Sequence, residues 1–246
     1  MQHRSKKIKK SFFIILAVLI ILFGSSAIYL GNYYHSVDVE KYMNGSSEVS
    51  VEKFDKGWFF DGAGEEKALI FYPGAKVATE AYAPLMYQLT ESGIDCFLVD
   101  MPFHMAFFGM NRAEEIMQEY NYEAWYLGGH SLGGAMAANF AADYVEDHTD
   151  GIRGLLLLAA YPTKDLSTSD MSVVTVYGSE DGVLNMDKIV AGRELMPQDY
   201  KEVCIEGGNH AQFGSYGAQK GDGTAAIPAE EQWARTVEVF VDDESE

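Results

Sequence analysis

The stretch that decides the fold runs from Ala124 to Phe140 and reads AWYLGGHSLGGAMAANF. An apolar run leads into Gly129-His130-Ser131-Leu132-Gly133, which has the form G-x-S-x-G, and an alanine-rich helical pattern follows. This order of strand, sharp turn and helix is the context in which the motif forms a nucleophile elbow. Glycines two residues to either side of the serine let strand and helix approach without side-chain clashes. We therefore expect Ser131 to be a nucleophile at a helix N-terminus, where negative charge is favoured.

Length and composition favour one globular domain behind a distinct N-terminal segment. Of the 246 residues, 48% are hydrophobic and 13% are aromatic, which is typical of a packed core. The net charge is −19, and five positive charges lie among the first ten residues. The remainder carries 13 Lys and Arg against 37 Asp and Glu, a net charge of −24. A surface this acidic repels nucleic acid and anionic lipid. Neither is therefore expected as a ligand of the domain.

The N-terminal residues divide by composition into a basic tail, an apolar stretch and a polar linker. Residues 1–11 are basic, 12–30 are almost wholly apolar, and 31–47 are polar and rich in tyrosine. As a helix, the apolar stretch would be about 28 Å long, close to the hydrocarbon thickness of a bilayer. We therefore expect one N-terminal transmembrane helix, which leaves residues 48–246 as the catalytic domain.

The basic tail also predicts the orientation of this helix. Positive charges stay in the cytoplasm, so the tail is expected inside and the catalytic domain outside, held by a single-pass signal anchor. The alternative is a secreted protein, because Ser25-Ser26-Ala27 resembles a signal-peptide cleavage site, with cleavage near Ala27.

Cysteine usage gives no indication of a metal site. Cys96 and Cys204 both lie inside apolar, strand-like runs, so we expect two buried free thiols. The chain has no Cys-x-x-Cys pair and no Cys/His ligand spacing, so we expect neither a metal nor a cofactor.

Apolar runs that alternate with helical patterns predict the fold class. Continuous apolar runs indicate strands buried on both faces, and the alternation indicates a mostly parallel central sheet with helices on both faces. A short antiparallel strand pair is expected between Val49 and Phe60. Residues 161–172, between two expected strands, are too few for a large cap domain. The expected strands are 68–72, 94–99, 124–127, 154–160, 173–177 and 203–205, and the expected helices are 79–92, 111–120, the elbow helix to Asp147, 186–196 and 229–241.

Residues suited to catalysis follow four of these strands. Ligands of parallel sheets bind beyond the carboxyl ends of the strands, and Gly74-Ala75, Ser131, Asp181 and His210 all fall there. A serine nucleophile needs a base, and the base needs a carboxylate that orients it. In elbow architectures the chain order is serine, acid, histidine. Among six histidines, His210 alone follows both the serine and a plausible acid on a loop after a strand.

The acid and the oxyanion hole are less sharply defined by the sequence. Asp181 is the preferred acid because it follows a strand in Gly178-Ser179-Glu180-Asp181, and Glu180 and Asp165 are alternatives. The tetrahedral intermediate needs two backbone N–H donors. One comes from Leu132, the residue after the nucleophile, and the other from the loop after the strand 68–72, where Ala75 is the best candidate.

With these residues in place, the chain from about Val49 onward resembles the α/β-hydrolase superfamily. The matching pieces are Tyr72-Pro73-Gly74-Ala75, Gly129-His130-Ser131-Leu132-Gly133, Gly178-Ser179-Glu180-Asp181 and Gly208-Asn209-His210. The chain is most similar to compact bacterial serine hydrolases of the dienelactone-hydrolase-like, or "hydrolase family 5", kind. Dienelactone hydrolases proper carry a cysteine nucleophile, which Ser131 replaces here.

The residues and the resemblance together imply a serine hydrolase that cleaves a carboxylic ester or related acyl compound through an acyl-enzyme. The expected partner is a small acyl substrate, with membrane association through the N-terminal helix, and the oligomeric state is left open. A peptidase or amidase on the same triad and a non-catalytic binding module on the same scaffold are the alternatives. An intact Ser, Asp and His set favours an enzyme over the binding module.

Overall fold

The computed structural model describes residues 15–25, 29–148 and 151–243, in two separate units. Met1–Tyr33 form the first unit and Tyr34–Glu246 the second. In the first unit, residues 15–25 and 29–31 are helical. Within the described ranges, no helix has both the length and the apolar character needed to span a membrane. The transmembrane helix predicted over 12–30 is therefore not found there, and residues 12–14 and 26–28 of it lie outside the described residues.

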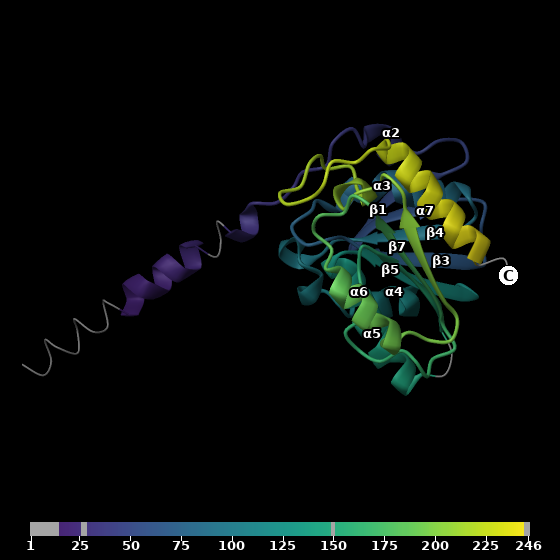
Figure 1. Ribbon diagram of the computed structural model, residues 1–246. Coiled ribbons are helices and arrows are strands. Elements are labelled where there is room, and N and C mark those ends of the chain that lie inside the picture. The colour runs from purple at the N-terminus through teal and green to yellow at the C-terminus, as the bar shows by residue number, and fades with distance from the viewer. Residues whose placement is uncertain (1–14, 26–28, 149–150, 244–246) are drawn as a thin grey trace, which may run out of the picture. The chain divides into compact units, whose positions relative to one another are not determined.

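An eight-stranded sheet forms the centre of the second unit (Figure 1). The strands are β1 (Ser50–Phe54), β2 (Gly57–Asp61), β3 (Lys67–Tyr72), β4 (Asp95–Val99), β5 (Ala124–His130), β6 (Ile152–Leu158), β7 (Ser172–Gly178) and β8 (Tyr200–Ile205). Their spatial order is β1-β2-β4-β3-β5-β6-β7-β8. The β1/β2 and β2/β4 pairs are antiparallel, and all the others are parallel. The expected mostly parallel sheet and the N-terminal antiparallel pair are both confirmed.

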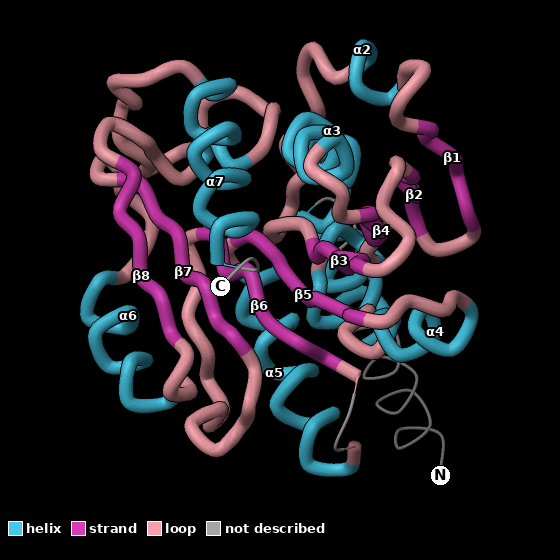
Figure 2. Tube along the Cα trace, turned by 90° about the vertical axis from the view of Figure 1, so that its right-hand side faces the viewer, coloured by secondary structure: helices cyan, strands magenta, loops and turns pink. Residues whose placement is uncertain are grey.

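Helices cover both faces of this sheet, as Figure 1 and Figure 2 show. Helices α3 and α7 pack against each other on one face, and α5 packs on the other face against β3, β5 and β6. Their bounds are α3 (Ala83–Glu91) and α7 (Ala229–Asp243) on the first face and α5 (Leu132–Asp147) on the second, with α2 (Glu40–Met43), α4 (Arg112–Glu119) and α6 (Met186–Gly192) as shorter helices. Short 3₁₀ segments are η1 (Thr79–Tyr82), η2 (Pro102–His104), η3 (Ala106–Phe108), η4 (Arg193–Leu195) and η5 (Ala211–Phe213).

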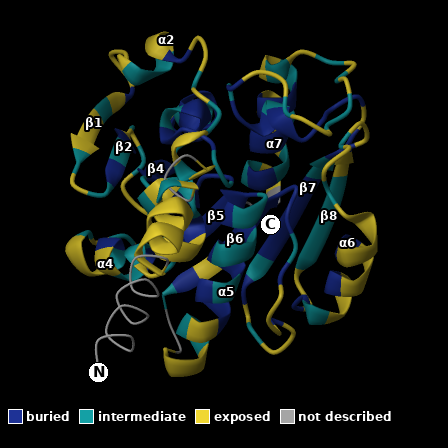
Figure 3. Cartoon of the chain, turned by 90° about the vertical axis from the view of Figure 1, so that its left-hand side faces the viewer, coloured by how far each residue is buried: buried dark blue, intermediate teal, exposed yellow. Residues whose placement is uncertain are grey.

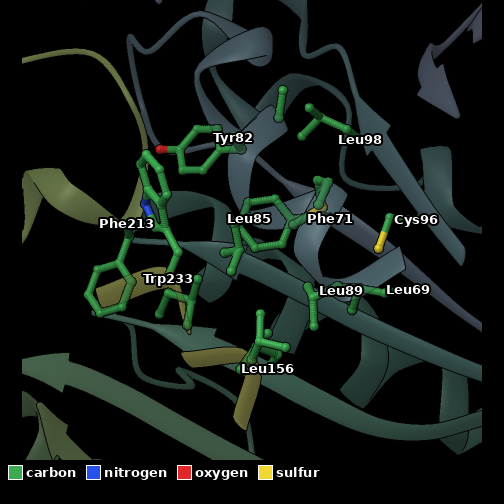
Figure 4. Packing of buried hydrophobic residues seen from close by; sticks show 14 of the residues in the cluster. Leu69, Phe71, Tyr82, Leu85, Leu89, Cys96, Leu98, Leu156, Phe213 and Trp233 are labelled. Atoms are coloured by element: carbon green, nitrogen blue, oxygen red, sulfur yellow. The ribbon is translucent and has the colours of Figure 1, made fainter. Parts of the chain in front are cut away.

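Alternate side chains of each central strand enter two different cores. In β3, Leu69 and Phe71 pack in the core beneath α3 and α7, whereas Ile70 and Tyr72 pack in the core beneath α5. Because successive strand side chains point to opposite faces, a strand covered on both faces must be apolar throughout. This explains the continuous apolar runs of the sequence. Figure 3 shows the resulting burial of the central strands, and Figure 4 shows the first of the two cores.

The segment predicted as a linker, 31–47, is packed against the domain from Tyr34 onward. Tyr34 bridges Val77, with hydrogen bonds from Tyr34 N–H to the Lys76 carbonyl (2.7 Å) and from Ala78 N–H to the Tyr34 carbonyl (2.8 Å). Val39, which precedes α2, is buried in the core with α3. The polar composition of this segment concealed these contacts, because both backbone and side-chain partners lie far away in the sequence.

The two thiols differ in exposure. Cys96 in the central strand β4 is buried as expected, and burial raises the pKa of its thiol. The prediction of a buried Cys204 is wrong, because this residue is exposed. Cys204 lies on β8, the edge strand of the sheet, so one of its faces lacks the cover that the inner strands have. An apolar run of three residues does not distinguish an edge strand from a central one.

Candidate active site

The parallel strands end in register at one edge of the sheet. Tyr72 pairs with Gly129, His130 with Leu158, Leu158 with Val176, and Gly178 with Ile205. The loops that follow β3, β5, β7 and β8 therefore start side by side. These loops carry all the predicted site residues, which the sequence had placed only relative to strand ends.

Ser131 occupies the sharp turn between β5 and α5. Its backbone has φ 55° and ψ −122°, and its N–H donates to the Leu158 carbonyl at 2.8 Å. A non-glycine residue at such angles costs roughly 1–3 kcal/mol, which the surrounding structure must offset. A Cβ placed on Gly133 would lie 2.1 Å from the Tyr72 carbonyl oxygen, and one on Gly129 would lie 2.6 Å from the Gly133 carbonyl carbon. The two flanking glycines are therefore required by close packing, as the motif predicts.

The structure brings His210 and Asp181 together on neighbouring loops. His210 Nδ1–H donates to Asp181 Oδ2 at 2.8 Å, and each side chain is 2% exposed. The other carboxylate oxygen of Asp181 accepts the N–H groups of Val183 (2.8 Å) and Leu184 (2.7 Å). These bonds fix the carboxylate, and the carboxylate in turn fixes the histidine tautomer and leaves Nε2 unprotonated, as a general base requires.

The two alternative acids do not contact His210. Glu180 is exposed, and its Oε1 accepts a hydrogen bond from the adjacent Ser179 hydroxyl. Asp165 is exposed as well, and it accepts the Ser167 N–H within its own loop. Hydrogen bonding to Ser167 lowers the pKa of Asp165. Of the three carboxylates that the sequence left open, Asp181 is the one that orients the histidine.

The loop after β3 places the Ala75 amide between two amides that have partners. Gly74 N–H donates to the Tyr82 hydroxyl at 3.0 Å, and Lys76 N–H donates to the His104 carbonyl at 2.7 Å. Ala75 lies between them in a turn and is half-buried. Leu132 is the first residue of α5, so its N–H belongs to the first helical turn, whose N–H groups have no partner within the helix. Leu132 adjoins Ser131 at the start of α5, and Ala75 lies on the loop after β3; their role as oxyanion donors stays a prediction.

Two residues that hold the histidine loop escaped the sequence analysis. Asp222 accepts N–H groups from His210 (3.2 Å) and Ala211 (2.8 Å), and also from Gly182 (3.1 Å) in the loop of Asp181. Gln232 of α7, fully buried, pairs with both the N–H (3.0 Å) and the carbonyl (2.8 Å) of Asn209. The position of Asp222 in a glycine-rich loop gave no signal. The position of Gln232 on the apolar side of an amphipathic helix was a signal that could have been used.

The loop between β6 and β7 leaves the site without a cap. Residues 159–171 contain no helix or strand, in agreement with the prediction from their number. In the described part of the chain, no cluster of three or more His, Cys, Asp or Glu side chains is arranged to hold a metal ion.

Comparison with known proteins gives the family and the fold. The sequence model of a family described as the alpha/beta hydrolase family matches residues 68–234. No curated protein sequence matches the chain significantly.

Solved structures with the same fold include several esterases. Carboxyl esterase 2 from the fungus Tuber melanosporum is 12% identical with a TM-score of 0.59, covering 85% of this chain and 89% of its own. A thermostable esterase from Pseudomonas putida ECU1011 is 17% identical with a TM-score of 0.57, covering 85% and 84%. A monoacylglycerol lipase from Paleococcus ferrophilus is 14% identical with a TM-score of 0.57, covering 80% and 99%.

The contacts of Asp222 generate a prediction for stability. In Asp222→Asn an amide NH₂ replaces one acceptor oxygen and faces backbone N–H groups, so at least one of them loses its partner. We expect a loss of about 1–3 kcal/mol in the free energy of unfolding, measured by urea denaturation. Glu231→Gln is the control, because its exposed pair with Arg235 contributes less than about 1 kcal/mol. Equal unfolding midpoints for the two variants would contradict the role assigned to Asp222.

Proposed function

Because the chain belongs to the alpha/beta hydrolase family, we propose that it is a serine hydrolase that cleaves carboxylic esters of small acyl compounds. The observation that carries the proposal is the hydrogen bond between His210 Nδ1 and Asp181 Oδ2, at 2.8 Å with both side chains almost fully buried. A buried aspartate that fixes a histidine, at the same edge of the sheet as a serine with strained backbone angles, supports the constellation used for acyl transfer on several unrelated folds.

In this mechanism Ser131 is the nucleophile and His210 the general base. The Nε2 atom of His210 takes the proton of the Ser131 hydroxyl as its oxygen attacks the ester carbonyl carbon. The Asp181 carboxylate stabilises the imidazolium that forms. His210 then gives the proton to the leaving alcohol, and an acyl-enzyme remains on Ser131. Water then attacks the acyl carbon as His210 Nε2 takes its proton. The proton passes to the Ser131 oxygen as the carboxylic acid leaves.

The N–H groups of Ala75 and Leu132 bind the oxyanion in each tetrahedral intermediate. Preorganised donors of this kind act on charge that develops only in the transition state, so they increase kcat more than they lower KM. The N-terminus of α5 adds the favourable potential of its helix dipole at the same position.

The substrate class is supported by the short loop between β6 and β7 and by the structural neighbours. Residues 159–171, between β6 and β7, add no helix or strand to the site, and we take this as favouring small esters over polypeptides. Two of these neighbouring structures are named as esterases and one as a monoacylglycerol lipase. These names concern those proteins, and they make an ester the first substrate to test here.

Replacement of the nucleophile gives the first test of the mechanism. Ser131→Ala should lower kcat on p-nitrophenyl acetate by several orders of magnitude, on the order of 10⁶-fold where nucleophile and base act as a unit. It should also abolish labelling by a fluorophosphonate probe. A variant that keeps a tenth of the activity of the unmodified enzyme would rule out Ser131 as nucleophile.

A pair of neighbouring carboxylates provides a matched test of the acid. Asp181→Asn should lower kcat about 10⁴-fold, because the amide no longer holds the histidine in the required tautomer. Glu180→Gln, one residue away and exposed, should change kcat less than about twofold, since surface changes have small effects. Steady-state kinetics on the same ester decides between them, and a larger loss in Glu180→Gln would assign the role to that residue.

The location of the enzyme is part of the same proposal. We place the catalytic domain on the extracytoplasmic side, held by the apolar segment 12–30, because five positive charges precede this segment and should stay in the cytoplasm. Secretion after cleavage near Ala27 is the competing arrangement.

Protease accessibility distinguishes these arrangements. Protease added to intact spheroplasts should degrade the catalytic domain of the cell-associated protein. Survival of the domain until the cells are lysed would reverse the orientation. Mature protein whose N-terminus lies near Ile28 would replace the anchor with a cleaved signal peptide.

A further inference from the structure

A buried hydrogen-bonded chain joins the oxyanion loop to the side of the catalytic histidine. The Tyr82 hydroxyl accepts the Gly74 N–H at 3.0 Å and lies 2.7 Å from His130 Nδ1. The ring of His130 lies 4.4 Å from the ring of His210, measured between centroids. Tyr82 is fully buried and His130 is 1% exposed. The proposed mechanism uses neither side chain, although both lie within one contact of groups that it does use.

The proton positions in this chain follow from its chemistry. An amide N–H can only donate, so the Tyr82 oxygen accepts from Gly74 and its own hydrogen is free to be donated. The His130 Nδ1 atom is the acceptor within reach, so it carries no proton, and the proton of the neutral imidazole sits on Nε2. The direction of donation is therefore fixed from Gly74 through Tyr82 to His130.

The other end of this hydrogen-bonded chain, the His130 ring, faces His210. Within the described residues, His130 Nε2 is a buried atom that makes no hydrogen bond. Burial lowers the pKa of His130 well below its ordinary value, repulsion by His210 lowers it further, and contact with the His210 backbone opposes both. His130 therefore stays neutral beside the catalytic base, and its ring lies against the ring of His210. Apo-enzyme contacts of this kind are often long and tighten when the transition state forms.

Tyr82 connects these hydrogen bonds to the apolar core. Its ring packs in the core beneath α3 and α7, 5.2 Å from Phe71 between ring centroids. In Figure 4 its hydroxyl oxygen points away from Cys96 and Leu98, toward the edge of the cluster. Burial raises the pKa of this hydroxyl, so it keeps the hydrogen that it donates.

We infer that Tyr82 and His130 are positioning residues that hold the Gly74–Ala75 amides and the His210 segment in register across the nucleophile. The inference rests on the proposed serine mechanism, because it gives these residues a part in that reaction. Tyr82 fixes the amide plane that precedes the Ala75 N–H. His130, bonded to the same hydroxyl, packs against His210 and so fixes the position of the base relative to that amide. Neither residue touches the substrate. Their effect should appear in kcat, where the oxyanion donors act, rather than in KM.

The test compares two buried tyrosines in the full-length protein. Tyr82→Phe removes the acceptor of the Gly74 N–H and the donor to His130. Tyr72→Phe is its match, because the Tyr72 hydroxyl likewise accepts a backbone N–H, from Ala113 at 3.0 Å, and donates to the Met110 carbonyl. Both variants should lose similar stability. We expect kcat to fall about 10- to 100-fold in Tyr82→Phe with KM within about threefold, and to change less than about threefold in Tyr72→Phe, since a single oxyanion donor is worth about 10²–10³ in kcat.

Two variants of similar size test the other half of the chain. His130→Asn can still accept the Tyr82 hydrogen through its side-chain oxygen, whereas His130→Leu cannot. The Asn variant should therefore keep at least about five times the kcat of the Leu variant, in keeping with a hydrogen bond worth about 1 kcal/mol. Equal loss in both would reduce His130 to a packing residue and overturn its assignment.

Amide exchange gives a readout that does not depend on turnover. Exchange at Gly74 should be at least about tenfold faster in Tyr82→Phe than in Tyr72→Phe, since a lost hydrogen bond of about 1–2 kcal/mol exposes that amide. Unchanged exchange, or equal kcat in the two tyrosine variants, would overturn the inference. Failure of the serine mechanism is recognised separately, because Ser131→Ala would then remain active.

Discussion

The backbone of Ser131 can hold its positive φ because two neighbouring positions carry no side chain. Gly133 lies so close to the end of β3 that a Cβ would overlap the Tyr72 carbonyl oxygen. This contact fixes the start of α5 against the strand that leads into the oxyanion loop. The elbow is thus held between β3, β5 and β6, the last through the bond from Ser131 N–H to the Leu158 carbonyl. The strain at the serine is offset by sheet packing, and every other part of the site takes its position from it.

The loops of the acid and the histidine approach each other closely where Gly178 meets Gly208, and hydrogen bonds between the loops add to this contact. Glu180 N–H donates to the Gly208 carbonyl at 2.8 Å, and Gly207 N–H donates to the Ser179 hydroxyl at 2.8 Å. Asp222 then binds both loops through their N–H groups, and Gln232 anchors Asn209 from helix α7. A buried carboxylate and histidine would otherwise lose much of their interaction to loop motion, because each loop residue ordered costs about 1–2 kcal/mol. The bond between His210 and Asp181 therefore depends on polar groups that take no part in it.

Buried polar groups on the core side of the elbow also hold loops of the site in position. Tyr82 and His130 lie among apolar side chains, where leaving a polar atom without a hydrogen bond costs more free energy than it would in water. Their positions would hold the loop of Gly74 and the loop of His210 at a fixed distance from each other. The apolar core thus holds Tyr82 and His130 in place, and their polar atoms in turn hold the loops at the edge of the sheet.

The sequence by itself determined the order of elements, the elbow and the histidine that pairs with Asp181. Apolar runs and turn residues are local signals, so the strands and helices of the second unit lie close to where they were expected. Chain order separated His210 from five other histidines. The same local signals failed for Cys204, because an edge strand and a central strand have the same period, and for Tyr34, because its partners Lys76, Tyr216 and Lys220 are remote in sequence.

Only the tertiary structure decided which side chains meet. Glu180 and Asp181 are adjacent and chemically alike, yet the turn that Val183 and Leu184 close around Asp181 buries one carboxylate and leaves the other in water. Asp222 and Gln232 gained their roles because chain folding returns a glycine-rich loop and the last helix to the end of β8. Whether a polar side chain is a surface group or a support for the site depends on partners far away in sequence. No local pattern encodes those partners, because they are set by how the strands are ordered and how closely their ends approach.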